Sequence, residues 1–557
     1  MWTPRRGVVE YLNVGDNREV LLVSRKGKMK DGGRIVASDV ERPPFDLVVV
    51  HRERYSYKDA TGQERVKATK GDCALHLRYE CIVPRMARAY ASDFVTFLNK
   101  AVTPYHAVAE CINLLKSAGF EELKEADQWR IVPNGKYYLT RNNTCLYAMA
   151  IGGQFEPGNG FSIVAAHTDS PVLKVKSRSK YESGECLQVG VSAYGGGLWH
   201  TWFDRDLSLA GQVVVKQENS LSRRLVDLSG PVLFIPNLAI HLTEDRAKFV
   251  FNKETHLRPI LASAAAEKLA GVEKKDKDAL VGAEKDHHET LLKLVAQKLN
   301  VAVDKIVEFD LTLYDSQPAA LVGCHEEFLS GGRLDNLVGT YTAVRALLDS
   351  LQDAGSATLA DEKNVRLAIC FDNEEVGSGS AQGAMSALTT WLLRRLSSRA
   401  NFDAPSTPSA ESAADAFERS IAKSLLVSAD QAHALHPNYK EKHEDNLRPA
   451  FHGGVVVKVN PNQRYATTAW THALLKKIAA DNDLPLQVVE VRNDSPCGST
   501  IGPLLSQSLG LAAVDVGTPM LAMHSCREFM DASGIQQACQ LYKAFFVGYS
   551  TLYDSLN

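Results

Sequence analysis

A chain of 557 residues is long enough for two or more domains, each with a large apolar core. Its composition, 45% hydrophobic and 23% charged, is that of a folded globular protein, which excludes a largely disordered chain. The formal net charge of -3 gives no electrostatic case for binding nucleic acid or an anionic membrane.

The N-terminal sequence and the cysteines predict a soluble protein of the cytoplasm. Residues 1–6 carry two arginines, but no apolar core of about 7 to 15 residues comes after them, so a secretory signal is not expected. No run approaches the roughly 18 consecutive apolar residues of a membrane span. The 10 cysteines include no CxxC pair, and several lie inside apolar runs, which favours a reducing compartment over a disulfide framework.

The first 85 residues differ in pattern from the rest of the chain. They alternate apolar runs with polar, lysine-rich turns, which predicts a small strand-rich extension or a partly disordered arm over residues 1–85. A helix is then expected over residues 92–101. Thr103-Pro104 provides the N-cap and first residue of a second helix, for which Gly119 is the stop signal.

An apolar strand over residues 161–166 leads to His167 and begins a pattern of strands that end in ligand-type residues. Residues 179–306 interrupt this pattern with further strand-like runs and a charged, helix-prone stretch. The pattern resumes over residues 307–557. Within it, residues 397–412 are rich in Ser, Pro and Ala and predict an exposed loop.

Acidic and histidine side chains come after strand-like runs at several points. The pair Glu374-Glu375 lies just past the apolar run 367–371, and adjacent carboxylates can divide two tasks, one binding a metal and the other handling the proton of metal-bound water. Three more residues follow an apolar run in the same way: His167, Asp430 and His524. A fourth residue, Asp335, lies at the start of a helix-like stretch.

Taken singly, each of these residues has an ordinary alternative, such as a helix N-cap or a solvated turn. Their shared position is more informative, because ligands bind outside the carboxyl ends of the strands in open α/β sheets. A mixed set of histidine nitrogens and carboxylate oxygens suits zinc or a similar divalent ion.

Several stretches, taken in chain order, resemble the M18 family of metallo-aminopeptidases, the aspartyl aminopeptidases. They include AAHTDSP at 165–171, RLDN at 333–336, DNEEVGS at 372–378, SADQAH at 428–433 and MHS at 523–525. The resemblance covers the chain from residue 86 to the C-terminus, and residues 1–85 have no counterpart.

The resemblance implies a fold in three segments. A zinc-aminopeptidase-like α/β catalytic domain, with a mixed central sheet flanked by helices, would be formed by residues 86–178 and 307–557. Residues 179–306 would be an inserted, β-rich dimerisation domain.

The resemblance also implies two divalent metal ions per subunit, zinc with cobalt or manganese as alternatives. Asp335 would bridge the two ions, since one carboxylate can offer an oxygen to each. His167 and Asp430 would bind one ion, and Glu375 and His524 the other.

The implied reaction is hydrolysis of the peptide bond after an unblocked N-terminal residue. Glu374 would be the general base that activates the metal-bridging water and later protonates the leaving amine. Asp169, two residues from His167, would accept the second N–H of its imidazole and fix the tautomer; the alternative is an ordinary turn carboxylate.

Selectivity for N-terminal Asp or Glu needs a cation, because a buried, unpaired carboxylate is costly. Lys458 lies in the apolar run 455–459, where a lysine is unusual unless it is paired or its ammonium reaches solvent. The resemblance assigns Lys458 to the substrate carboxylate, with Tyr465 and His433 as further pocket residues.

His241 matches a family histidine that reaches the active site of a neighbouring subunit. The alternative is a histidine of the dimer interface or the core. The resemblance implies an obligate oligomer, a homododecamer as in relatives, with peptides bearing acidic N-termini as substrates.

Two other classes of protein stay open. A related two-metal deacylase or carboxypeptidase would use nearly the same ligands, and the pocket lysine separates them. A metal-free interaction scaffold is disfavoured because all five ligands and Glu374 are intact.

Overall fold

The computed structural model describes residues 85–271, 282–352, 358–402 and 414–556, together with five short strands within the first 67 residues. The chain divides into two units, Met1–Ile82 and Val83–Asn557. The first unit contains a three-stranded antiparallel sheet and a two-stranded hairpin: β1 (Val9–Asn13), β2 (Glu19–Val23), β3 (Asp46–Val50), β4 (Tyr55–Lys58) and β5 (Glu64–Lys67).

Two parts of the predicted organisation lie mainly outside the described residues. They are the remainder of the arm at 1–85 and most of the loop at 397–412. Among the helices that the structure describes, none is long and apolar enough to cross a membrane.

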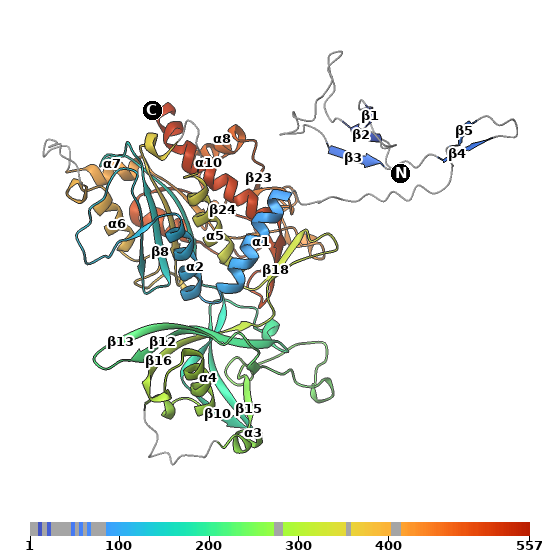
Figure 1. The fold of residues 1–557 in the computed structure, drawn as a ribbon, viewed down its shortest axis with the longest axis vertical. Coiled ribbons are helices and arrows are strands. Elements are labelled where there is room, and N and C mark those ends of the chain that lie inside the picture. The colour runs from blue at the N-terminus through green and yellow to red at the C-terminus, as the bar shows by residue number, and fades with distance from the viewer. Residues whose placement is uncertain are drawn as a thin grey trace. The chain divides into compact units, whose positions relative to one another are not determined.

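A nine-stranded mixed sheet forms the centre of the second unit (Figure 1). The strands β24, β20, β9 and β19 run parallel, whereas β8 and β22 join the sheet antiparallel. In order across the sheet the strands are β23 (Leu486–Val489), β22 (Val455–Lys458), β24 (Ala512–Gly517), β20 (Leu425–Ala429), β9 (Phe161–His167), β19 (Val365–Phe371), β8 (Cys145–Ile151), β7 (Lys136–Arg141) and β6 (Glu121–Glu122).

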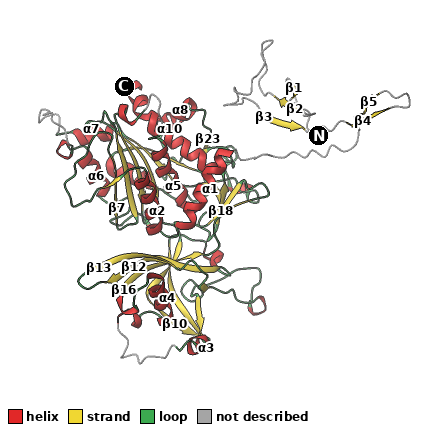
Figure 2. Ribbon diagram, viewed as in Figure 1, coloured by secondary structure: helices red, strands yellow, loops and turns green. Residues whose placement is uncertain are grey.

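Helices cover both faces of this sheet (Figure 2), which explains why the central strands are apolar at nearly every position. In β9, Val164 packs into one core and Ile163 into the other, because successive side chains point to opposite faces. One core contains residues of α1 (Arg85–Lys100), α2 (Pro104–Ser117), α5 (Leu334–Asp349), α8 (Ala469–Asp481) and α10 (Ser533–Leu556); the other contains residues of α6 (Leu388–Leu396), α7 (Ala416–Ala422) and α9 (Ile501–Leu509). The predicted α/β class is confirmed.

The start of α2 agrees with the prediction, because Thr103 caps the helix by accepting the backbone N–H of His106 and Pro104 is its first residue. The preceding helix, α1, begins at Arg85, earlier than the predicted start at Ser92.

A second, antiparallel sheet comes between β9 and β19 of the central sheet in the sequence, as predicted for a β-rich insert. The additional pairing of β12 with β16 closes it into a barrel-like form around its own core, which includes α4 (Glu289–Leu299). Its strands, most of them green in Figure 1, are β10 (Val172–Ser183), β11 (Cys186–Tyr194), β12 (Asp206–Lys216), β13 (Leu221–Asp227), β14 (Leu233–Phe234), β15 (Ile260–Ser263) and β16 (Ile306–Asp315). The predicted segment boundaries at 178/179 and 306/307 fall within β10 and β16 and stay a prediction.

A small five-stranded sheet supports two of the predicted ligands. Its order is β17 (Ala320–Val322), β18 (Phe328–Gly331), β26 (Glu528–Asp531), β25 (Pro519–Leu521) and β21 (Ala432–His433). Asp335 lies just beyond β18, at the start of α5, and His524 lies in the turn after β25.

Candidate active site

The five predicted ligands converge at one edge of the central sheet. His167 is the last residue of β9, Asp430 comes directly after β20, and Glu375 lies in a one-turn helix just past the end of β19. These three strands are parallel neighbours, so their carboxyl ends meet. Asp335 at the start of α5 and His524 in the turn after β25 complete the group.

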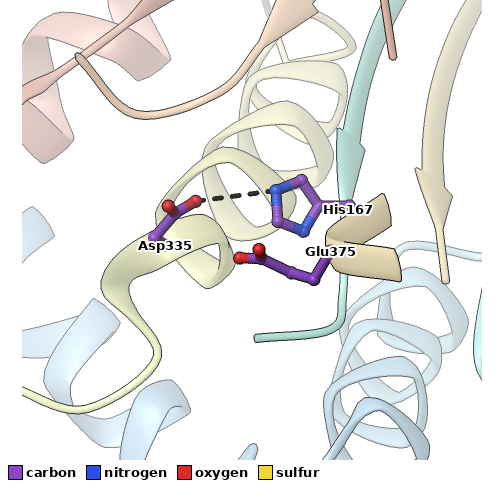
Figure 3. Close-up of side chains that lie close together, drawn as sticks. All are labelled: His167, Asp335 and Glu375. Carbon is purple, nitrogen blue, oxygen red and sulfur yellow. Dashed lines mark ion pairs between the residues drawn. The ribbon is translucent and has the colours of Figure 1, made fainter. Parts of the chain in front are cut away.

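The carboxylate of Asp335 stands between two histidines. Its Oδ1 lies 3.5 Å from Nε2 of His167, and its Oδ2 lies 3.3 Å from Nε2 of His524. His167 Nε2 is also 3.5 Å from Oδ1 of Asp430, and His524 Nε2 is 3.4 Å from Oε1 of Glu375. Figure 3 shows the side chains of His167, Asp335 and Glu375 pointing toward one another.

These separations fit metal ions. An ion bound tetrahedrally at about 2.0 to 2.2 Å holds its ligand atoms about 3.3 to 3.6 Å apart, which matches the four nitrogen–oxygen distances. Two buried oxygens, Asp335 Oδ1 and Glu375 Oε1, have no hydrogen-bond partner, although such atoms are normally satisfied. The donor set and these two unpartnered oxygens therefore suit the binding of metal.

The electrostatics of the acids point the same way. Burial, together with the negative charges of neighbours such as Asp430, raises the pKa of Glu374 to about 7. Burial and Asp335 raise the pKa of Glu375 as well. The surroundings thus disfavour the negative charges of Glu374 and Glu375, and bound cations would offset that cost. The pKa of Asp335 is instead lowered, because hydrogen bonds and the charges of His167 and His524 outweigh its burial.

Asp169 is buried beside this group and contacts the backbone of both Glu374 and Glu375. Its two oxygens accept the N–H groups of Glu374 and Glu375, each at 3.1 Å, and its Oδ2 also accepts the hydroxyl of Tyr194 at 2.6 Å. Nδ1 of His167 lies 3.0 Å from the backbone oxygen of Asp169 and 3.4 Å from its Oδ1. Asp169 is therefore placed to orient the imidazole of His167.

A cleft of about 630 Å³ opens over the five ligands and Glu374. Lys458, Tyr465 and His433 all line it. Lys458 is 3% exposed, its Nζ lies 3.4 Å from Oδ2 of Asp430, and it stands 5.3 Å from the centre of the Tyr465 ring. Burial, and then the charge of Lys458, lower the pKa of His433, which favours its neutral ring.

Comparison with known proteins places the chain in a family. The family model described as "Aminopeptidase I zinc metalloprotease (M18)" matches residues 97–546. The aspartyl aminopeptidase of Caenorhabditis elegans is 53% identical over 475 residues, which are 84% of this chain and 97% of that protein. Aspartyl aminopeptidase 4 of Saccharomyces cerevisiae is 43% identical over 83% of this chain and 95% of its own length.

The chain belongs to the M18 family. It is a metallo-aminopeptidase and thus a hydrolase, and the family description supports zinc as its metal. Solved structures agree with the fold: the matching chain of the "Ape4 and Nbr1 complex" has a TM-score of 0.79 at 42% identity and covers 85% of this chain and 88% of its own. The mApe1 dodecamer of Saccharomyces cerevisiae has a TM-score of 0.73 at 27% identity, with coverage of 84% and 99%.

One predicted site residue of this M18 chain lies elsewhere. His241 is exposed in a one-turn helix of the insert and does not line the cleft of its own chain. The sequence reasoning also overlooked a residue that contacts the group. Glu528 is a buried acid at the start of β26, four residues after His524, and this closeness in sequence to a predicted ligand was the available signal.

Proposed function

We propose that this protein removes an unblocked N-terminal Asp or Glu from peptides, using two metal ions bridged by Asp335. Two distances carry the proposal. Each oxygen of Asp335 lies close to a different histidine, and each histidine belongs to a different group of ligands. A single ion would be bound by one of these groups, and the other group would have no cation to bind.

One ion would be held by His167, Asp430 and Oδ1 of Asp335, and the other by His524, Glu375 and Oδ2 of Asp335. Zinc is the ion that the donor set favours, with cobalt or manganese as alternatives. When bound, the ions would supply Lewis acidity at the scissile carbonyl and lower the pKa of the attacking water.

Glu374 is the proposed general base. Its side chain is 15% exposed at the cleft, and its Oε2 lies 3.9 Å from Nε2 of His167. It would take the proton of the attacking water and then deliver it to the leaving amine. Asp169, which accepts the backbone N–H of Glu374, would hold this carboxylate against the cleft.

Lys458 is the proposed determinant of acidic specificity. An ammonium that is almost fully buried at the wall of the cleft offers a substrate carboxylate a charge-assisted hydrogen bond. Tyr465, whose ring lies next to Lys458, and His433 would complete this pocket. Lys458 already faces Asp430, so it would contact both the substrate and a metal ligand.

We further propose that the enzyme is a cytoplasmic homo-oligomer of twelve subunits. The relative mApe1 is a dodecamer, and the free cysteines among the described residues suit a reducing compartment. His241 would enter the active site of a neighbouring subunit. Its surroundings support an interface, because Leu238, Ile240 and Leu242 are 59 to 70% exposed.

A substrate panel tests the function. The panel separates the proposed aminopeptidase from a deacylase or carboxypeptidase. It contains peptides that begin with Asp, Glu or Ala, the Nα-acetylated Asp peptide and an acyl-amino acid. We expect cleavage of the free Asp and Glu peptides alone; preference for the acylated or C-terminal bond would instead indicate a deacylase or carboxypeptidase.

The variant Glu374→Gln provides the matching test of chemistry. The amide is nearly isosteric, so metal and fold should be retained, while kcat falls by about 10²-fold or more. A near-normal kcat would remove Glu374 from the mechanism, and wild-type protein without any hydrolysis would favour the scaffold alternative.

A further inference from the structure

We propose that Glu528 is a positioning residue that sets the distance between the bridging ligand and His524. Its Oε2 accepts the backbone N–H of Asp335 at 3.0 Å, and its Oε1 accepts the backbone N–H of His524 at 2.7 Å. The two ligands lie 189 positions apart in the chain (524 − 335), so no local backbone constraint relates them. One carboxylate thus joins two separate ligand segments.

Glu528 is buried in the small five-stranded sheet. Glu528 is 2% exposed, begins β26, and pairs in register with Gly331 of β18, the strand that leads to Asp335 at the start of α5. The sheet therefore holds the backbone of Glu528, and the two N–H groups that it accepts hold its side chain. Glu528 in turn holds the backbone of Asp335 and of His524. The orientation of these two side chains toward the site is therefore constrained as well.

The backbone of His524 needs such support. Its φ of +67° lies in the left-handed region, which a residue other than glycine enters only at a cost in energy. Surrounding contacts must maintain this conformation. Glu528 accepts its N–H, and the backbone oxygen of His524 accepts the N–H of Leu198 at 2.9 Å.

Only a carboxylate can make both contacts. Each oxygen of Glu528 accepts one N–H, whereas a glutamine would offer one acceptor and turn its NH₂ group toward the second N–H. Glu528→Gln would therefore release either Asp335 or His524 while it changes little in volume. Asp169 makes the corresponding pair of contacts to the N–H groups of Glu374 and Glu375, so two buried carboxylates hold four functional residues.

This inference rests on the proposed metal site, and the test uses zinc affinity as its readout. The full chain, stripped with a chelator, is titrated with zinc against a chromophoric competitor. Glu528→Gln is compared with Glu362→Gln, because Glu362 is also a buried carboxylate that accepts a backbone N–H, from Asn364 at 2.9 Å, and its strong partner is Arg366.

We expect Glu528→Gln to lower zinc affinity by about 10 to 100-fold, with activity restored by excess zinc. Glu362→Gln should lower the melting temperature but leave zinc affinity unchanged. Glu528→Asp keeps the carboxyl group but shortens the side chain, so it should fold and still bind zinc more weakly than wild type.

Wild-type zinc affinity in both Glu528 variants would overturn the inference. An equal loss in Glu362→Gln would also overturn it, because the effect would then belong to the fold and not to the ligands. Wild-type protein that binds no zinc in the same titration would be a different result, since it would reject the proposed metal site itself.

Discussion

Replacing Lys458 with methionine measures what the positive charge of Lys458 contributes to the proposed specificity pocket. Lys458 ends β22, is 3% exposed, and lines the cleft with its Nζ 3.4 Å from Asp430. Methionine keeps most of the apolar stem and removes the ammonium. A charge-assisted hydrogen bond contributes about 1.5 to 3 kcal/mol, so kcat/KM for N-terminal Asp and Glu should fall about 10 to 150-fold.

The geometry adds a second effect that the assay must separate. Asp430 loses its neighbouring cation, which changes a proposed metal ligand. We therefore expect a smaller, substrate-independent decrease alongside the selective one, and zinc content should be measured in parallel. Steady-state kinetics with matched Asp, Glu and Ala peptides give the ratio of the two effects.

A matched control removes a lysine elsewhere. Lys363 pairs with Asp554 at 2.6 Å on the surface, and Lys363→Met should leave the whole panel unchanged. If Lys458→Met lowers kcat/KM by the same factor for acidic and neutral peptides, Lys458 supports the structure or the metal ligand and does not select the substrate.

Single contacts and the bound metal give three further predictions. Asp335→Asn should lower zinc content below that of wild type by elemental analysis, because it weakens the ligand that the two proposed ions would share. Removing zinc with a chelator should abolish hydrolysis and lower the melting temperature, and zinc should restore both. Asp531, through a hydrogen bond, raises the pKa of His452. His452→Gln should therefore destabilise the fold more at about pH 5.5 than at about pH 8.5, since this contribution is present below the ordinary histidine pKa and is lost as pH rises through the raised one.

Parallel strands made most of the candidate site predictable from sequence. A buried parallel strand is a continuous apolar run, so its end is visible, and the next polar residues lie at the edge where neighbouring ends meet. His167, Glu375 and Asp430 obey this rule, and the structure brings them together with Asp335 and His524. Their role as metal ligands stays a prediction.

The remaining contacts depend on tertiary structure. In the sequence Glu528 is one more acid near a strand, and only the folded chain brings its two oxygens to the backbone of Asp335 and His524. The pairing of Lys458 with Asp430 joins the ends of β22 and β20, two strands separated by β24. Register between such distant strands is set by packing, which a residue pattern alone does not report.

His241 gives the strongest test of assembly, because its exposed side chain lies outside the cleft of its own chain. If it is donated to a neighbour, a complete site needs Glu374 from one subunit and His241 from another. Two inactive variants, Glu374→Gln and His241→Ala, are mixed under conditions that allow subunits to exchange. Random mixing makes half of the pairs mixed, and each mixed pair contains one complete site out of two, so activity should recover to about a quarter of wild type. Mixing Glu374→Gln with the double variant Glu374→Gln/His241→Ala is the control and should stay inactive. If the first pair also stays inactive while labelled subunits demonstrably exchange, His241 acts within its own subunit or has no part in the reaction.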